Sequence, residues 1–328
     1  MKIKVFMQTG SSASERNILL HAGAGLQKYL DKKYGVPPLE TVRLGRWQKA
    51  FPFVEYEYGD SYSACDLAVM FGSWKPREKG HHVVRNSVAV NASNFVCIET
   101  ALLGRKTSQE NTHYRVGLNG FLCRDAYWPN YDEAAGASRL EQLGIQWDGW
   151  KNNPDGHILL ALQLPADASL RGIDISQWAA ETIRSIRTHT DRPIVVRSHP
   201  LVGDRGFTGY SSLISSVVCE NISDVSFSEG SKQTWAEDLA DAYCTVTYTS
   251  GLAIDSIIAG VPTLACDPGN FAFDISSNFT NQIESLSLAD QKVIEIWLRQ
   301  LALYQWTADE MANSDMWERY IEIAVNKK

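Results

Sequence analysis

Short apolar runs alternate with longer amphipathic stretches along the first half of the chain. Residues 2–8 have the pattern of a strand that ends in a Gly/Ser turn, and the leucines of residues 16–34 recur at helical spacing. Further short apolar runs, separated by loops, occupy residues 67–71, 88–91, 95–99 and 115–118. The pattern predicts a βα opening, with a turn at the carboxyl end of the strand that either faces a ligand or caps the helix.

The same alternation resumes after a polar, linker-like segment at residues 151–156. A strand is expected at residues 157–163, a helix at 175–188 and a strand at 193–197, and residues 288–325 have a continuous helical pattern. Short buried strands that alternate with helices favour a parallel sheet.

Residues 244–267 have the clearest local pattern, a strand, a tight turn, a helix and a second strand. Ser250-Gly251 ends the first strand, and Gly260 ends a short helical run before Pro262. A helix that starts at the end of a strand directs backbone N–H groups and the positive end of its dipole at Thr249-Ser250-Gly251, which would suit a diphosphate. Asp255 lies about one helical turn later, where a carboxylate could accept hydrogen bonds from a ribose. The alternative is a plain βαβ unit with a capping serine.

The length of the chain, 328 residues, is enough for two domains, expected at residues 1–150 and 151–328. No apolar run approaches the roughly 18 residues of a membrane helix, and the first residues do not have the pattern of a signal peptide, so we expect a cytoplasmic protein. The six cysteines form no CxxC pair, which indicates reduced core residues rather than disulfides or a zinc site.

Charge divides unevenly between the two halves. Residues 1–150 carry 18 Lys and Arg against 15 Asp and Glu, whereas the whole chain has a net charge of −7. The basic half is therefore the one expected to meet a polyanion. Charge runs are usually solvated loops. The candidate acceptor-binding cations among them are Arg46, Lys75, Arg77, Lys79 and Arg85.

The segment Arg197-Ser198-His199-Pro200 follows a predicted strand directly. An arginine fork and an imidazole at the carboxyl end of that strand could bind phosphate or nucleoside groups beside the Thr249 turn. A single loop histidine is more often structural, so both interpretations stay open at this point.

The order of four segments resembles the donor-binding half of GT-B glycosyltransferases. These segments are ILLALQ (158–163), PIVVRSHP (193–200), DLADAYCTVTYTSGLAIDSIIAGVPTLA (238–265) and LALYQWTADEMANSDMWERY (301–320). The resemblance, which covers roughly residues 90–325, is to the capsular-polysaccharide-synthesis type and its phage-encoded relatives. It implies an α/β fold of two Rossmann-like domains facing a cleft, with the acceptor on the N-terminal domain. The nucleotide-sugar donor would bind the C-terminal domain, which the C-terminal helices close.

The resemblance also assigns roles to individual residues. His199 and Ser250-Gly251 would contact the donor phosphates, and Asp255, where glutamate is commoner, would bind the ribose. The full set of expected donor-binding residues is Gln163, Arg197, His199, Thr249, Ser250, Gly251 and Asp255. The donor is expected to be a UDP-sugar, with no permanently bound cofactor and no metal.

The catalytic base in inverting enzymes of this type is a carboxylate or histidine of the N-terminal domain. Glu99, at the end of a predicted strand, is the first candidate, although it could equally be an ordinary strand-end acid. Asp66, His81 and His82 are weaker candidates.

The predicted activity is sugar transfer from a nucleotide-sugar to an acceptor hydroxyl. The first candidate acceptor is a hydroxymethylated pyrimidine in phage DNA, and a phage protein would act in the host cytoplasm. Capsular or lipopolysaccharide glycan is the second. A sugar-nucleotide epimerase is a rival, although its family carries a Gly-Gly turn and paired acids where this chain has TSGLAIDS. A non-catalytic nucleic-acid-binding protein is another.

Overall fold

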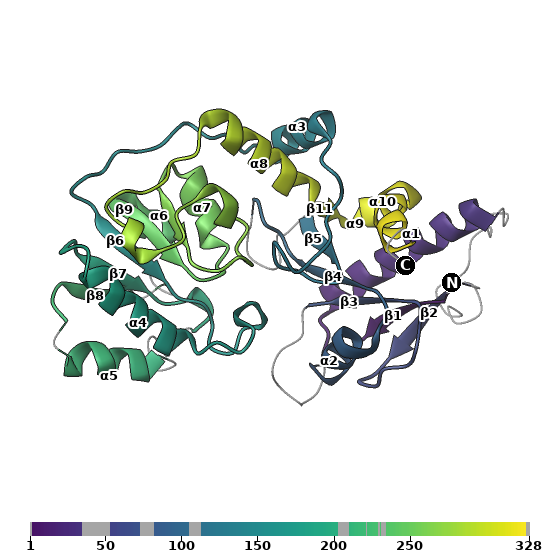
Figure 1. Ribbon diagram of the computed structural model, residues 1–328. Helices are drawn as coiled ribbons and strands as arrows, with labels where there is room; N and C mark the ends of the chain where they lie inside the picture. The colour runs from purple at the N-terminus through teal and green to yellow at the C-terminus, as the bar shows by residue number, and fades with distance from the viewer. Residues whose placement is uncertain are drawn as a thin grey trace. The chain divides into compact units, whose positions relative to one another are not determined.

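The computed structural model of the chain describes residues 2–34, 53–72, 82–104, 113–202, 210–220, 222–228, 230 and 234–325. The chain forms two compact units, each an α/β fold with its own sheet and core, as the sequence predicted (Figure 1). Unit 1 comprises Met1–Phe121, Asp125–Arg139 and Gln300–Lys328, and unit 2 comprises Leu122–Arg124 and Leu140–Arg299. The division falls inside helices α3 (Glu133–Gln142) and α8 (Gln291–Leu303), which differs from the expected boundary after residue 150.

The sheet of unit 1 has six strands in the order β11-β5-β4-β3-β1-β2. Four of them run parallel, namely β1 (Ile3–Met7), β2 (Val54–Tyr58), β3 (Leu67–Phe71) and β4 (Phe95–Thr100). Strand β5 (His113–Leu118) pairs antiparallel with β4, and β11 (Gln305–Thr307) pairs antiparallel with β5. The carboxyl ends of β1, β3 and β4 therefore lie at one edge of the sheet.

Helix α1 (Ala13–Tyr34) covers one face of this sheet. It begins with a reciprocal cap, because Ser12 Oγ accepts a hydrogen bond from the Glu15 N–H and Glu15 Oε2 accepts one from the Ser12 N–H. Val5, Val69 and Ile98 pack in the same core as the buried side of α1. Helix α2 (His82–Asn91), which includes the apolar run at 88–91, lies on the other side of the sheet (Figure 1).

The C-terminal segment belongs to unit 1, although the sequence placed it in the second domain as continuous helix. Residues 305–307 form strand β11, followed by α9 (Ala308–Met311) and α10 (Ser314–Val325). Trp317 and Tyr320 are fully buried in the core with α1, and Tyr320 Oη donates to the Val116 carbonyl at 2.6 Å. Pairing of Gln305–Thr307 with β5 outweighs the local helical preference of these three residues.

The sheet of unit 2 is entirely parallel, with the order β10-β9-β6-β7-β8. Its strands are β6 (His157–Ala161), β7 (Ile194–Arg197), β8 (Val225–Ser228), β9 (Ala242–Thr247) and β10 (Thr263–Ala265). The expected strand, turn, helix and strand of residues 244–267 are confirmed, with α7 (Leu252–Ile258) between β9 and β10.

Helices cover both faces of this sheet, so its strands read as continuous apolar runs. Helix α4 (Ile175–Arg187) starts at the N-cap Asp174 and packs with α5 (Ser211–Cys219) on the face of Ile158 and Leu160. Leu239 of α6 (Trp235–Ala240) and Leu252 of α7 pack on the face of Leu159. Within the described part of the chain, no helix is long and apolar enough to cross a membrane.

Candidate functional site

Strand order in unit 2 creates one position where neighbouring loops leave the sheet in opposite directions. From β6 the chain proceeds to β7 and then β8 on one side, and it returns to β9 and β10 on the other. The order therefore reverses between β6 and β9, and ligands of parallel α/β sheets bind outside the carboxyl ends of the strands at such a point. The loops at this point start at Leu162 and Tyr248.

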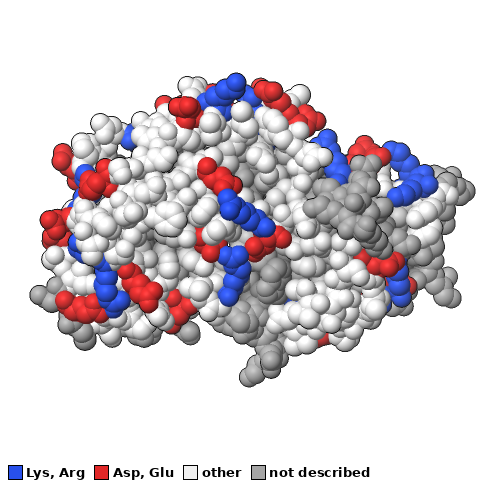
Figure 2. All heavy atoms as spheres, viewed as in Figure 1, with Lys and Arg blue, Asp and Glu red and all other residues white. Residues whose placement is uncertain are grey.

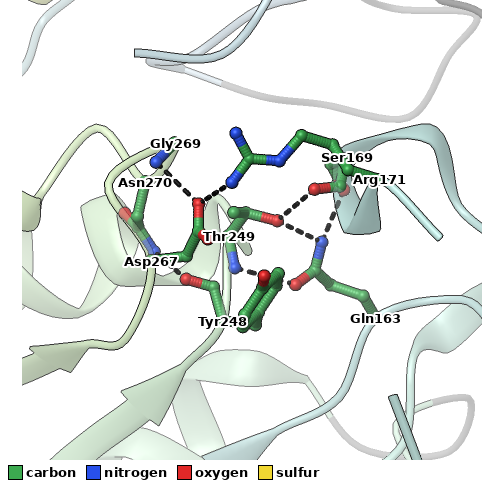
Figure 3. A network of polar contacts seen from close by, with 8 residues as sticks. All are labelled: Gln163, Ser169, Arg171, Tyr248, Thr249, Asp267, Gly269 and Asn270. Atoms are coloured by element: carbon green, nitrogen blue, oxygen red, sulfur yellow. Dashed lines mark hydrogen bonds and ion pairs between the residues drawn. The ribbon is translucent and has the colours of Figure 1, made fainter. Parts of the chain in front are cut away.

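Gln163 joins these two loops through its side-chain amide (Figure 3). Its Oε1 accepts a hydrogen bond from the Thr249 backbone N–H at 2.9 Å, and its Nε2 donates to Thr249 Oγ1 at 2.9 Å. Nε2 also donates to Ser169 Oγ, and Thr249 Oγ1 donates to the Ser169 carbonyl at 3.0 Å. All three side chains are buried. Gln163 and Thr249 therefore hold the turn in place, and the Thr249 N–H is already used inside the protein.

An arginine that the sequence did not single out lies beside this turn. Arg171 follows the 3₁₀ turn Ala168–Leu170, has a left-handed backbone with φ 51°, and pairs with Asp267 after β10. Asp267 Oδ1 also accepts the Gly269 N–H at 2.7 Å. The Arg171 side chain is 35% exposed and that of Asp267 11%, so the pair combines an oriented cation with access to solvent.

Two further side chains complete the network of Figure 3. Asn270 Nδ2 donates to Thr247 Oγ1 at 2.9 Å and to the Tyr248 carbonyl at 3.1 Å, which fixes the end of β9. Burial, followed by the neighbouring Asp267 carboxylate, raises the pKa of the Tyr248 hydroxyl, so this group stays protonated at neutral pH. Arg171 and Asp267 could have been found in the sequence as charged residues in the loops that follow two apolar strands.

Arg197 is the clearest correction to the expected donor site. It is the last residue of β7, but its guanidinium is buried and pairs with Asp238 of α6, which also accepts from Ser228 Oγ at 2.8 Å. A second guanidinium nitrogen donates to the Gly230 carbonyl at 3.4 Å. Strand β6 separates β7 from β9, so Arg197 is not beside the Thr249 turn. The structure makes it a core ion pair rather than a ligand contact.

The remaining expected donor residues lie at or near the carboxyl edge of the same sheet. His199 is half-buried, and its Nδ1 accepts the Leu201 N–H at 3.2 Å. Ser250 Oγ accepts the Leu252 N–H at 3.2 Å, and Gly251 is the N-cap of α7 with an ordinary helical φ of −63°. Asp255 is half-buried in the first turn of α7. Since α7 has only seven residues, its dipole is smaller than the sequence argument assumed.

The expected acceptor-side residues belong to unit 1, and several are not described. Arg46, Lys75, Arg77, Lys79 and His81 lie outside the described residues, as does the side chain of His82. Arg85 is not part of a solvated loop, because it lies in α2 and is 8% exposed. Glu99 is half-buried at the carboxyl end of β4, opposite Arg115 in the β4·β5 pair. Asp66 is exposed at the other end of the strands, before β3.

Among the described residues, no group of three or more His, Cys, Asp or Glu side chains could hold a metal ion. Near the Thr249 turn, Arg171 presents a cation that pairs with Asp267 (Figure 3).

Comparisons with known proteins gave similarities in fold only. No protein-family model matches the chain, and no curated protein matches it. KpsC of Thermosulfurimonas dismutans, a beta Kdo 2,7 transferase, is 12% identical with a TM-score of 0.46 over 100% of both chains. The beta Kdo 2,4 transferase of the same KpsC is 11% identical with a TM-score of 0.47, covering 94% of this chain and 92% of that one. The Methanocaldococcus jannaschii UDP-GlcNAc 2-epimerase is 12% identical with a TM-score of 0.33 over 99% of this chain and 100% of that one.

Proposed function

We propose that this chain is a glycosyltransferase that binds a nucleotide-activated sugar at the carboxyl edge of the unit 2 sheet. The observation that carries the proposal is the pair of hydrogen bonds between Gln163 and Thr249, which joins two loops at the point where the strand order reverses. This link holds the Ser250-Gly251 turn beside a partly exposed arginine, Arg171.

In this proposal the residues of the site have separate roles. Arg171 replaces Arg197 as the cation that contacts the donor diphosphate, because its guanidinium has access to solvent and is oriented by Asp267. Ser250-Gly251 and His199 contribute further phosphate contacts, and Asp255 accepts hydrogen bonds from the ribose. Gln163 and Thr249 position the turn without contacting the donor. UDP is the first nucleotide to test.

The chemistry requires a base for the acceptor hydroxyl and a partner for the leaving diphosphate. We assign the base to Glu99 of unit 1, a half-buried carboxylate at the end of β4. Negative charge builds up on the diphosphate as the bond to the sugar breaks, and the Arg171 guanidinium stabilises that charge. No metal is needed for this step in the proposal.

We propose a glycan hydroxyl, rather than DNA, as the acceptor. Arg85, one of the cations expected to bind DNA, is buried inside unit 1. The other expected acceptor-binding cations lie outside the described residues. Cations in each unit form ion pairs with acids, as Lys2 does with Glu55 and Arg184 with Glu220, and Figure 2 shows the two charges interspersed on the face in view. DNA with hydroxymethylated pyrimidines stays the alternative, and its binding would weaken steeply with salt.

The proposal is tested by a thermal-shift and turnover screen of the full chain against UDP-, GDP- and CMP-sugars. Stabilisation by at least one of them is expected, and hydrolysis or transfer should follow with the same nucleotide. Interconversion of the donor to its epimer, without release of nucleotide, would identify an epimerase instead. An absence of binding to all three nucleotide classes would refute the proposal.

A further inference from the structure

Within the described part of the chain, three buried polar atoms at the carboxyl edge of the unit 1 sheet have no hydrogen-bond partner. They are Oε1 of Gln8, Oγ of Ser11 and Nε of Arg85, in residues that are 3%, 7% and 8% exposed. Buried polar atoms in proteins are almost always satisfied, and each exception requires an explanation. Three such atoms at one edge of a sheet are hydrogen-bonding groups that a polar ligand could use.

Strand register brings these residues together. Phe6 pairs with Met70 and Phe71 with Ile98, so Gln8, Gly72 and Glu99 follow at the same level on β1, β3 and β4. Gln8 Nε2 donates to the Phe71 carbonyl at 3.3 Å, which places its amide at the end of β3.

Arg85 reaches the same edge from helix α2. A Cβ added to Gly72, which has a left-handed φ of +80°, would lie 2.6 Å from Cζ of Arg85, so the guanidinium rests directly on the glycine backbone. Burial lowers the pKa of Arg85, and the nearby Glu99 and Glu15 carboxylates oppose that shift. The guanidinium is thus held between the strand ends and two acids.

The kinds of atom in this set distinguish the classes of ligand that fit. Because Gln8 Nε2 faces a carbonyl, Gln8 Oε1 is the atom left to accept a hydrogen bond. Arg85 Nε can only donate, and the Ser11 hydroxyl can do both. An ionised phosphate oxygen only accepts, so a phosphate group without a proton would leave Gln8 Oε1 unpaired. A sugar hydroxyl donates and accepts, and it satisfies the whole set.

We propose that Gln8, Ser11 and Arg85 form a binding site for a hydroxyl-rich sugar, with Gln8 Oε1 accepting from one hydroxyl and Arg85 Nε donating to another. Thr9 and Gly10, between Gln8 and Ser11 in the chain, are exposed, so the site lies next to the protein surface. Assigning this sugar as the acceptor rests on the proposed function, and it then binds at the same strand ends as the Glu99 carboxylate.

NMR of the ¹⁵N-labelled full chain tests the proposal through the Nε–H signal of Arg85. We would titrate the protein with methyl glycosides of neutral hexoses and, separately, with inorganic phosphate. At least one glycoside should shift the Arg85 signal saturably, whereas phosphate should not. The matched control is the Nε–H of Arg139, a largely buried unit 1 arginine that pairs with Glu310 and should not respond.

Other results would overturn the proposal. A saturable shift with phosphate but with no glycoside would identify an anion site. No shift with either ligand would mean that ordinary buried water satisfies these atoms.

A variant series separates this inference from the proposed function. Gln8→Leu and Ser11→Ala should each raise the Kd for the glycoside at least about tenfold. Ser11→Ala is the smaller change and serves as the second measurement if the Gln8→Leu protein does not fold. Neither change should alter the nucleotide-sugar Kd, which unit 2 determines. Unchanged glycoside affinity in both variants would refute the site, whereas glycoside binding without any nucleotide-sugar binding would refute the transferase and leave the sugar site in place.

Discussion

Gln163 and Thr249 lie 86 positions apart in the chain, and two hydrogen bonds of 2.9 Å join the side chain of one to the backbone and hydroxyl of the other. The Gln163 amide is a fixed bridge between the loops after β6 and β9, since both its oxygen and its nitrogen are satisfied by protein atoms. It therefore acts on a ligand by positioning the 249–251 turn.

Replacing Gln163 with leucine should loosen this turn while keeping the volume of the side chain. The change leaves the Thr249 N–H buried and unpaired, so we expect the nucleotide-sugar Kd to rise roughly tenfold, a loss of about 1.4 kcal/mol. Calorimetry of donor binding measures the effect. Gln177→Leu, which removes an exposed glutamine paired with Glu181 on α4, is the matched control and should leave donor affinity unchanged.

Arg171→Ala should weaken donor binding more strongly. Losing a charge-assisted hydrogen bond costs about 1.5–3 kcal/mol, so the Kd should rise roughly ten- to hundredfold. Arg171→Lys should recover only part of the loss, because an ammonium lacks the planar fork. The control is Arg184→Ala, which removes an exposed arginine paired with Glu220 in the same unit. Equal donor affinity in the Arg171→Ala and Arg184→Ala proteins would remove Arg171 from the site.

Arg197→Met should lower stability rather than act directly on the donor. The change leaves Asp238 as a buried, unpaired carboxylate, and breaking such a pair costs about 3–5 kcal/mol. Adding Asp238→Leu should recover a large part of this loss, because the second change removes the orphaned charge. Urea unfolding, followed by a signal from unit 2, measures both. If the Arg197→Met protein is stable but binds the donor much more weakly, Arg197 contacts the donor directly, as the sequence predicted.

Two half-buried histidines should make the protein less stable in mild acid. Burial lowers the pKa of His113, assisted by Arg139, and burial also lowers the pKa of His157. The folded protein thus holds both rings neutral, and the unfolded chain binds their protons first. Stability should fall as pH drops below about 6.5, the ordinary histidine pKa, and level off below the folded pKa values. Melting temperatures between pH 8 and 5 should vary less in a His113→Gln, His157→Gln double variant than in the natural protein.

Turnover is expected without a divalent metal. The leaving diphosphate would gain its stabilisation from Arg171 and the Ser250-Gly251 turn. Activity should therefore persist in EDTA and show no increase with Mg²⁺ or Mn²⁺. Loss of turnover in EDTA that either ion restores would contradict this prediction.

Local patterns predicted the elements whose signal lies within a few neighbouring residues. The strand at 67–71 and the helix expected at 175–188 depend on local apolar spacing, and both are found. Strand β11 was missed because its three residues sit inside a helical pattern, and its pairing with β5 involves residues almost 200 positions earlier. Sequence patterns contain little information about such distant partners.

The same limit explains the errors at the candidate site. Arg197 does end a strand at the expected edge, but its Asp238 partner is 41 positions away, so the sequence could not show that the charge is already neutralised. Arg85 looked like one cation in a basic run, yet the space above Gly72 accommodates its guanidinium inside unit 1. The Thr249 turn was identified because it is built from consecutive residues.

The return of residues 300–325 to unit 1 sets an order for folding during synthesis. Strand β11 and the buried Trp317 and Tyr320 are synthesised after all of unit 2, although the strands they pack against are made before it. Unit 2, whose residues end at Arg299, can form its core while the ribosome is still translating. Unit 1 therefore completes its sheet after the core of unit 2 can form, the reverse of the order in which the first strands of the two units are made, and the β5 edge stays open until β11 is synthesised.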